Sequence, residues 1–304
     1  MPRQSLISAG ASVASRNKRY VIWFFLLNLL FAWWGAAAFS SHAHEILDHS
    51  LYADKLLHGF DLIVLIELMA RPEFGPAKSS TAPATLFAVL FFLTSLVFMP
   101  GVLLGYSSDH RISREEFFRA CGHNVWRFVR LFLIYAVIAG ILGGVLFGAQ
   151  DALVKAVDKT VNDDRLPFVT QMLSLVVIFL VLTVIRIGFD LAQADVVLRD
   201  QRAVRKSLGW AFRATGRNFG RLLGTYVVVA IVGLVILAAG IVTWYAIVPP
   251  SSVLGAFLVS QATLLLLLGM RFWQRASAVA FYVRQAAELE IEVPVMAVPL
   301  ATGR

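Results

Sequence analysis

The chain has 304 residues, of which 59% are hydrophobic and 15% charged, with a formal net charge of +8. An ordinary soluble domain carries about 25% charged residues, so the composition excludes a water-soluble fold and predicts an all-α integral membrane protein. The basic residues are divided among segments that flank apolar stretches, and no soluble domain is present to hold a nucleic acid. We therefore expect no nucleic-acid partner.

Six apolar stretches are long enough to cross a hydrocarbon core, which takes about 20 helical residues. They span residues 20–41, 84–107, 131–149, 166–189, 222–247 and 252–270. We predict a polytopic helical bundle of six transmembrane helices in a single membrane domain, residues 1–283, followed by a cytoplasmic tail, 284–304. An alternative for the first stretch is a cleaved signal peptide. A retained span is favoured, because the apolar run from Tyr20 to Phe39 exceeds the about 7–15 residues of a signal-peptide core.

The distribution of Lys and Arg predicts the orientation. With six spans, the segments on the amino-terminal side of the membrane hold 20 of these residues and the opposite loops hold 6. Loops rich in Lys and Arg remain on the cytoplasmic side. The sequence therefore predicts a multi-pass protein of a bacterial inner membrane with both termini in the cytoplasm.

The external segment, residues 42–83, contains four of the six histidines. Imidazole and carboxylate groups bind divalent metals, so a candidate metal site comprises His42, His44, Glu45 and His49. Their spacing matches no established zinc signature, and a solvated polar helix face is the favoured alternative. We expect no cofactor.

An internal repeat is the clearest pattern in the chain. Residues 118–127 read FRACGHNVWR and residues 212–221 read FRATGRNFGR, identical at six of ten positions and each followed by an apolar stretch. We predict two amphipathic interfacial helices, 113–130 and 201–221, each leading into a span. Ser113 and Glu116 have the spacing of a capping box that starts the first of these helices.

Each predicted interfacial helix has a cationic face opposite an apolar one. Basic side chains in this position interact with lipid headgroups, preferably anionic ones. The predicted lipid-interface residues are Arg119, Arg127, Arg130, Arg213, Arg217 and Arg221. A regulatory or ligand-binding surface is the alternative.

Glycines recur at four-residue spacing in the third span, at Gly140, Gly144 and Gly148. This spacing removes side chains from one helix face and favours close contact with another helix of the bundle.

The fourth span carries charge. Arg186 and Asp190 are four residues apart and share a helix face, so we expect an intramembrane ion pair, with Asp195 at the cytoplasmic interface. Burial of charge is costly, which makes such a pair a candidate for ion or proton movement. The favoured alternative is a self-neutralised pair near the helix end that ties this span to the neighbouring interfacial helix.

Two segments, RAVRKSLGW at 202–210 and RNFGRLLG at 217–224, carry a family resemblance. They are similar to the membrane domain attached to some bacterial glycerophosphodiester phosphodiesterases and to its stand-alone, uncharacterised relatives. The resemblance implies a six-span helical bundle in a bacterial inner membrane. It does not extend to catalysis, because the chain contains no soluble phosphodiesterase domain.

No hydrolase, P-loop or dinucleotide-binding motif is found in the sequence. We therefore expect a non-enzymatic inner-membrane protein that scaffolds a protein partner in the membrane or interacts with membrane lipids, preferably anionic ones. The alternative is a small-solute or ion transporter with a polar site at Arg186 and Asp190. A third hypothesis is an intramembrane enzyme or a metal-dependent activity at the histidine-rich segment.

Overall fold

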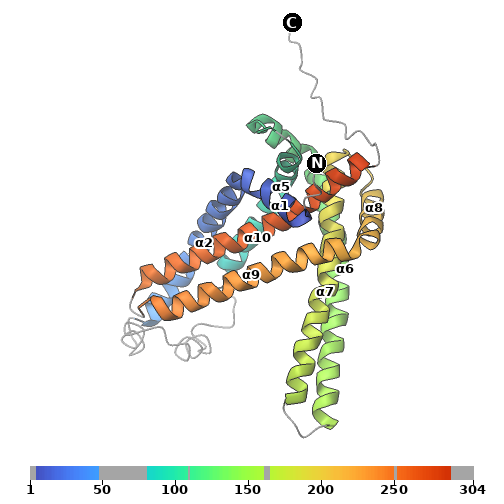
Figure 1. Ribbon diagram of the computed structural model, residues 1–304. Helices are drawn as coiled ribbons and strands as arrows, with labels where there is room; N and C mark the ends of the chain where they lie inside the picture. The colour runs from blue at the N-terminus through green and yellow to red at the C-terminus, as the bar shows by residue number, and fades with distance from the viewer. Residues whose placement is uncertain (1–4, 48–80, 109, 161–164, 250–251, 289–304) are drawn as a thin grey trace. The chain divides into compact units, whose positions relative to one another are not determined.

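The computed structural model describes residues 5–47, 81–108, 110–160, 165–249 and 252–288. Within these residues the chain is all-helical, and Figure 1 shows the helices in chain order. They are α1 (Leu6–Arg16), α2 (Lys18–Leu47), α5 (Thr81–Ser107), α6 (Arg114–Thr160), α7 (Arg165–Leu198), α8 (Val204–Arg217), α9 (Phe219–Ile247) and α10 (Val253–Glu288).

Six of these helices, α2, α5, α6, α7, α9 and α10, are long and apolar enough to cross a membrane. Each contains most or all of one predicted span, so the prediction of an all-α, multi-pass membrane protein is confirmed. The external segment is described only where α2 and α5 extend into it, and residues 289–304 of the predicted tail lie outside the described residues.

The chain divides into two compact units. The first comprises Met1–Ala14, Met99–Val229 and Trp273–Arg304, and the second comprises Ser15–Phe98 and Ala230–Phe272. In the second unit, α9 approaches α10 closely, because a Cβ atom at Gly233 would lie 3.7 Å from the Met270 side chain. The rings of Phe24 and Phe272 meet edge to face there, at 5.1 Å between centroids.

The first unit is organised around the carboxyl-terminal half of α7. From Ile185 to Leu198 nearly every residue is buried, whereas large apolar side chains such as Phe168 and Leu173 in the first half are exposed. Helix α6 packs along α7, and α8 packs against α7 (Figure 1). The buried core of this unit therefore lies at the carboxyl-terminal end of α7. The exposed apolar side chains elsewhere on α6 and α7 suit contact with hydrocarbon.

The two copies of the repeat differ in continuity. In the first copy, the predicted interfacial helix and span form one uninterrupted helix of 47 residues, α6. At about 1.5 Å per residue this helix is roughly 70 Å long, more than twice the hydrocarbon thickness of about 30 Å. In the second copy the chain bends at Asn218, which separates α8 from α9 with φ −119° and ψ 30°.

The start of α6 follows the predicted capping box. The Glu116 amide donates to Ser113 Oγ at 3.1 Å, and the Ser113 amide donates to Glu116 Oε2 at 2.7 Å. These hydrogen bonds hold the pKa of the Glu116 carboxyl below its usual value. Gly140, Gly144 and Gly148 depart from the expected close packing, because no described atom lies within 4 Å of a Cβ placed at any of them.

Candidate functional site

Each of the two aspartates of α7, Asp190 and Asp195, has an arginine four residues away, Arg186 within the helix and Arg199 directly after it. Arg186 Nε lies 3.8 Å from Asp190 Oδ2, and Arg199 Nε lies 3.7 Å from Asp195 Oδ1. The predicted Arg186–Asp190 pair is therefore present. Asp195 is only 2% exposed and has its own arginine, and its expected position at the cytoplasmic interface stays a prediction.

Tyrosine hydroxyls from two other helices complete these pairs. Tyr226 of α9 donates to Asp190 Oδ2 at 2.8 Å, and Tyr282 of α10 donates to Asp195 Oδ1 at 2.9 Å. In addition, Gln274 Nε2 of α10 donates to the Tyr226 carbonyl at 3.2 Å. Hydrogen bonds to charged groups are stronger than neutral ones, so the buried carboxylates connect α7 with α9 and α10. The two aspartates thus bind tyrosines of the long helices α9 and α10, whereas the sequence analysis expected the pair to tie α7 to the neighbouring interfacial helix.

A small residue between the two charges of the first pair allows α8 to approach α7. A Cβ atom at Gly188 would lie 2.7 Å from Phe212 Cε1. The Phe212 ring also packs edge to face on Phe189, with centroids 5.7 Å apart. Phe212 is the first residue of the second repeat, so this contact positions the repeat on α7.

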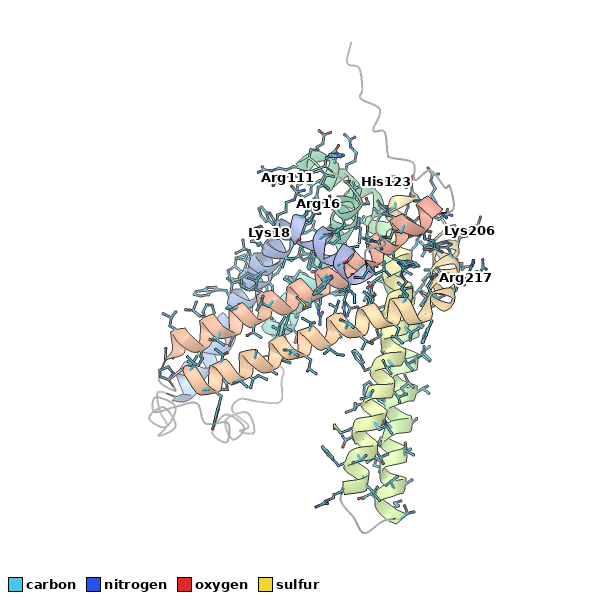
Figure 2. The ribbon with its side chains drawn as sticks, viewed as in Figure 1. Arg16, Lys18, Arg111, His123, Lys206 and Arg217 are labelled. Atoms are coloured by element: carbon cyan, nitrogen blue, oxygen red, sulfur yellow. The ribbon has the colours of Figure 1, made fainter. Side chains whose placement is uncertain are left out.

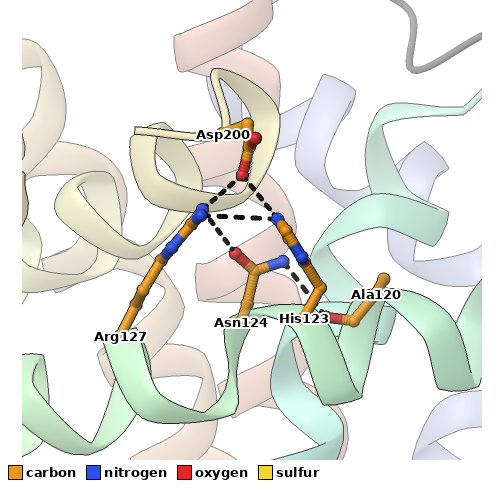
Figure 3. A network of polar contacts seen from close by, with 5 residues as sticks. All are labelled: Ala120, His123, Asn124, Arg127 and Asp200. Atoms are coloured by element: carbon orange, nitrogen blue, oxygen red, sulfur yellow. Dashed lines mark hydrogen bonds and ion pairs between the residues drawn. The ribbon is translucent and has the colours of Figure 1, made fainter. Parts of the chain in front are cut away.

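A second polar cluster joins the first repeat to the end of α7 (Figure 3). Arg127 Nη1 donates to Asp200 Oδ1, and His123 Nε2 lies 2.8 Å from the same oxygen. Asn124, which is fully buried, accepts from Arg127 Nη1 at 3.1 Å and donates to the Ala120 carbonyl at 3.1 Å. Asp200 has a positive φ of 50°, in the left-handed region, directly after α7. We call this cluster of His123, Asn124, Arg127 and Asp200 the Asp200 clamp.

The short distance between His123 and Asp200 determines which ring nitrogen carries a proton. Two unprotonated acceptors would repel at 2.8 Å, so we assign a proton to His123 Nε2. The 3.3 Å approach of Arg127 Nη2 to this nitrogen is then a contact and not a hydrogen bond. Partial burial raises the pKa of Asp200, but the hydrogen bonds and charges of Arg127 and His123 outweigh this effect and hold the pKa below its usual value.

The predicted lipid-interface residues separate into two groups. In the first repeat, Arg119 is paired with Glu115, and Arg130 lies over the Trp126 ring at 5.4 Å from its centroid. Arg127 departs from the prediction, because its side chain is only 11% exposed and its guanidinium binds Asp200.

In the second repeat, Arg213, Arg217 and Arg221 are all exposed. Figure 2 shows Arg217 and Lys206 projecting outward from α8. The opposite face of this helix is buried, at Val204, Ser207, Ala211, Ala214 and Thr215. The second repeat therefore presents its cations at the surface while it packs on α7 through small residues.

The candidate metal residues cannot be assembled into a site. His49 lies outside the described residues, and the side chains of His42, His44 and Glu45 are likewise outside the described part of α2. Among the residues that the structure does describe, no group of three or more His, Cys, Asp or Glu side chains could hold a metal ion.

No protein family, curated protein or solved structure matches the chain. The geometry of the α7 aspartates, the Asp200 clamp and the second repeat is therefore the basis for the functional argument.

Proposed function

We propose that the protein is a non-enzymatic, multi-pass inner-membrane scaffold whose cytoplasmic face associates with anionic lipids. The observation that carries this proposal is the set of exposed cations in the second repeat. Residues 201–221 contain six basic residues and no acidic one. They directly precede the apolar part of α9, where a spanning helix meets the headgroup layer.

The charges inside α7 support a structural role for that helix. Asp190 and Asp195 are 7% and 2% exposed, and each is bound by a nearby arginine, Arg186 of α7 or Arg199 just beyond its end, and by a tyrosine of another helix. A carboxylate that moves ions must exchange partners with water, whereas these two carboxylates are engaged by packed side chains. Orientation with both termini in the cytoplasm rests on the 20-to-6 distribution of Lys and Arg.

A transporter is the alternative, and one observation favours it. Arg275 of α10 interacts electrostatically with Asp190, so two arginines face one carboxylate, and its buried Nε has no hydrogen-bond partner in the described part of the chain. A surplus positive charge of this kind would attract an anion. Anion flux into liposomes that contain the protein, abolished by Arg275→Gln, would support this alternative over the scaffold.

The proposal is tested with the full chain in nanodiscs that contain either zwitterionic lipid alone or about one third anionic lipid. We expect the thermal unfolding midpoint to be higher with anionic lipid at low salt, and the difference to shrink at high salt because salt screens exposed charges. The variant Arg213→Gln, Arg217→Gln, Arg221→Gln should lose the difference. An equal midpoint in both lipids for the unaltered protein would contradict the proposal.

A further inference from the structure

The two repeats adopt the same local structure. Equivalent positions are buried alike: Ala120 and Ala214 at 6% and 3%, Cys121 and Thr215 at 3% and 2%. Farther along, Phe128 and Leu222 are each 1% exposed. The match in burial shows that the two copies use the same face for packing.

The repeated asparagine makes the same side-chain hydrogen bond in both copies. Asn124 Nδ2 donates to the Ala120 carbonyl at 3.1 Å, and Asn218 Nδ2 donates to the Ala214 carbonyl at 3.2 Å. Helical hydrogen bonds continue through the bend at Asn218. The Asn218 amide donates to the Ala214 carbonyl at 3.1 Å, and the Leu222 amide donates to the Asn218 carbonyl at 3.0 Å. The first repeat can therefore serve as a template for the second.

In the template, the side chains on either side of the asparagine bind an oxyanion. His123 and Arg127 converge on one oxygen of Asp200, a carboxylate supplied by the end of α7 (Figure 3). The equivalent residues of the second repeat are Arg217 and Arg221, both exposed. The second repeat thus keeps both hydrogen-bond donor positions of the clamp and replaces the histidine by a permanently charged arginine.

The second repeat lacks the acidic partners of the first. Glu115, which pairs with Arg119, is replaced at the equivalent position by Gly209, and no acidic residue occurs in 201–221. Asp200 is already bound by the first repeat. In the first copy Arg119 and Arg127 are paired with carboxylates of the chain. The second copy exposes a row of cations four residues apart, Arg213, Arg217 and Arg221.

We propose that Arg217 and Arg221 form an oxyanion clamp for the phosphate of an anionic phospholipid, which takes the place that Asp200 occupies in the first repeat. This inference deepens the proposed function, on which it rests, by assigning the lipid contact to one site. Phosphate oxygens suit the planar fork of a guanidinium as carboxylate oxygens do. The position supports a lipid source over free phosphate. Arg221 directly precedes the apolar part of α9, and the residue before a spanning segment lies near the headgroups when that segment crosses the bilayer.

The test measures the binding of short-chain lipids to the full chain in detergent by microscale thermophoresis. Three probes separate the sources of phosphate: dioctanoyl phosphatidylglycerol, dioctanoyl phosphatidylcholine and inorganic phosphate. The test variant is Arg217→Gln, Arg221→Gln. The matched control is Arg202→Gln, Arg205→Gln, which removes two exposed arginines near the other end of α8. A third variant, Arg217→Lys, Arg221→Lys, keeps the charge and removes the guanidinium fork.

We expect the unaltered protein to bind phosphatidylglycerol more tightly than either other probe. The Arg217, Arg221 variant should bind it at least about tenfold more weakly, since each basic residue near an anionic group contributes about 1 kcal/mol before screening. The control should change by no more than about threefold, and the lysine variant should fall between them. Unchanged thermal unfolding of all three variants would show that exposed residues were altered without loss of the fold.

Two results would overturn the clamp. Equal weakening in the test and control variants would mean that the lipid responds to the charge of α8 as a whole, and the proposed function would stand without a clamp. Inorganic phosphate that binds as tightly as phosphatidylglycerol and competes with it would mean that the site takes a free anion. If the unaltered protein does not prefer phosphatidylglycerol over phosphatidylcholine, both the clamp and the proposed function fail.

Discussion

Replacement of Asp190 by alanine should destabilise the protein more than replacement of Asp190 and Arg186 together. The carboxylate is 7% exposed, accepts a hydrogen bond from Tyr226 at 2.8 Å and lies 3.8 Å from Arg186. Its removal leaves a half-buried guanidinium and a buried hydroxyl without their acceptor. Loss of one member of a buried pair costs about 3–5 kcal/mol, and the 34% exposure of the Arg186 side chain places the expected loss near the lower end, about 3 kcal/mol.

The double variant removes the stranded charge, so its loss should be smaller, about 2 kcal/mol, most of it from the Tyr226 hydroxyl and the lost packing. Arg275 limits the recovery, because its charge also interacts with Asp190. The assay is a double-mutant cycle on the free energy of unfolding in detergent, with Arg186→Ala as the fourth member. A double variant that is as unstable as the sum of the two single variants would refute the pairing.

The remaining predictions concern packing, pH and lipid. Gly188→Ala should destabilise the protein by about 1–3 kcal/mol, because the new methyl group meets the Phe212 ring. Gly140→Ala should be neutral or slightly stabilising, because no described atom of another element lies within 4 Å of the added methyl group. Unfolding curves that do not separate the two variants would contradict the α7–α8 contact. Because the pKa of Asp200 is lower in the folded chain than its ordinary value of 3.8, its stabilising effect is present above that pH and is lost as the pH falls through the lowered pKa. In Asp200→Asn the unfolding midpoint should therefore fall less steeply as the pH drops below 3.8, and an unchanged pH profile would contradict the Asp200 clamp. Gly209→Glu gives the second repeat the acid that Glu115 supplies in the first, four residues before Arg213 and in open space, and should weaken the binding of anionic lipid. Gly209→Gln should leave that binding unchanged. Equal effects of the two variants would point to a steric cause.

The features that could be predicted from the sequence are those that depend on residues close together along the chain. The capping box of Ser113 and Glu116 and the pairing of Arg186 with Asp190 follow from spacings of three and four residues, and both are present. The six spans follow from hydropathy for the same reason, because a spanning helix satisfies its backbone hydrogen bonds within one segment.

The partners that were missed lie far apart in the sequence. Tyr226 is 36 residues from Asp190, and Tyr282 is 87 residues from Asp195. An aromatic residue in an apolar helix gives no indication of which helix its hydroxyl will face. Arg199 did have a local signal, since it is four residues after Asp195 and mirrors the spacing of the first pair.

Asp200 was not singled out in the sequence, because its contact with Arg127 spans 73 residues. The repeat offered a partial signal, because the first copy has acidic neighbours that the second lacks. The sequence alone placed Arg127 and Arg221 in the same class, as cations at a lipid interface. The structure separates them, since within the described residues Arg127 binds the carboxylate of Asp200 and Arg221 is exposed without such a pair.

Native mass spectrometry of the full chain, released from its own membrane, tests directly whether the second repeat binds anionic lipid at the membrane surface. We predict that the unaltered protein retains anionic phospholipid and that the variant Arg213→Gln, Arg217→Gln, Arg221→Gln loses it, while Arg119→Gln, whose cation is already paired with Glu115, retains it. The same retained lipids in all three proteins would contradict the account.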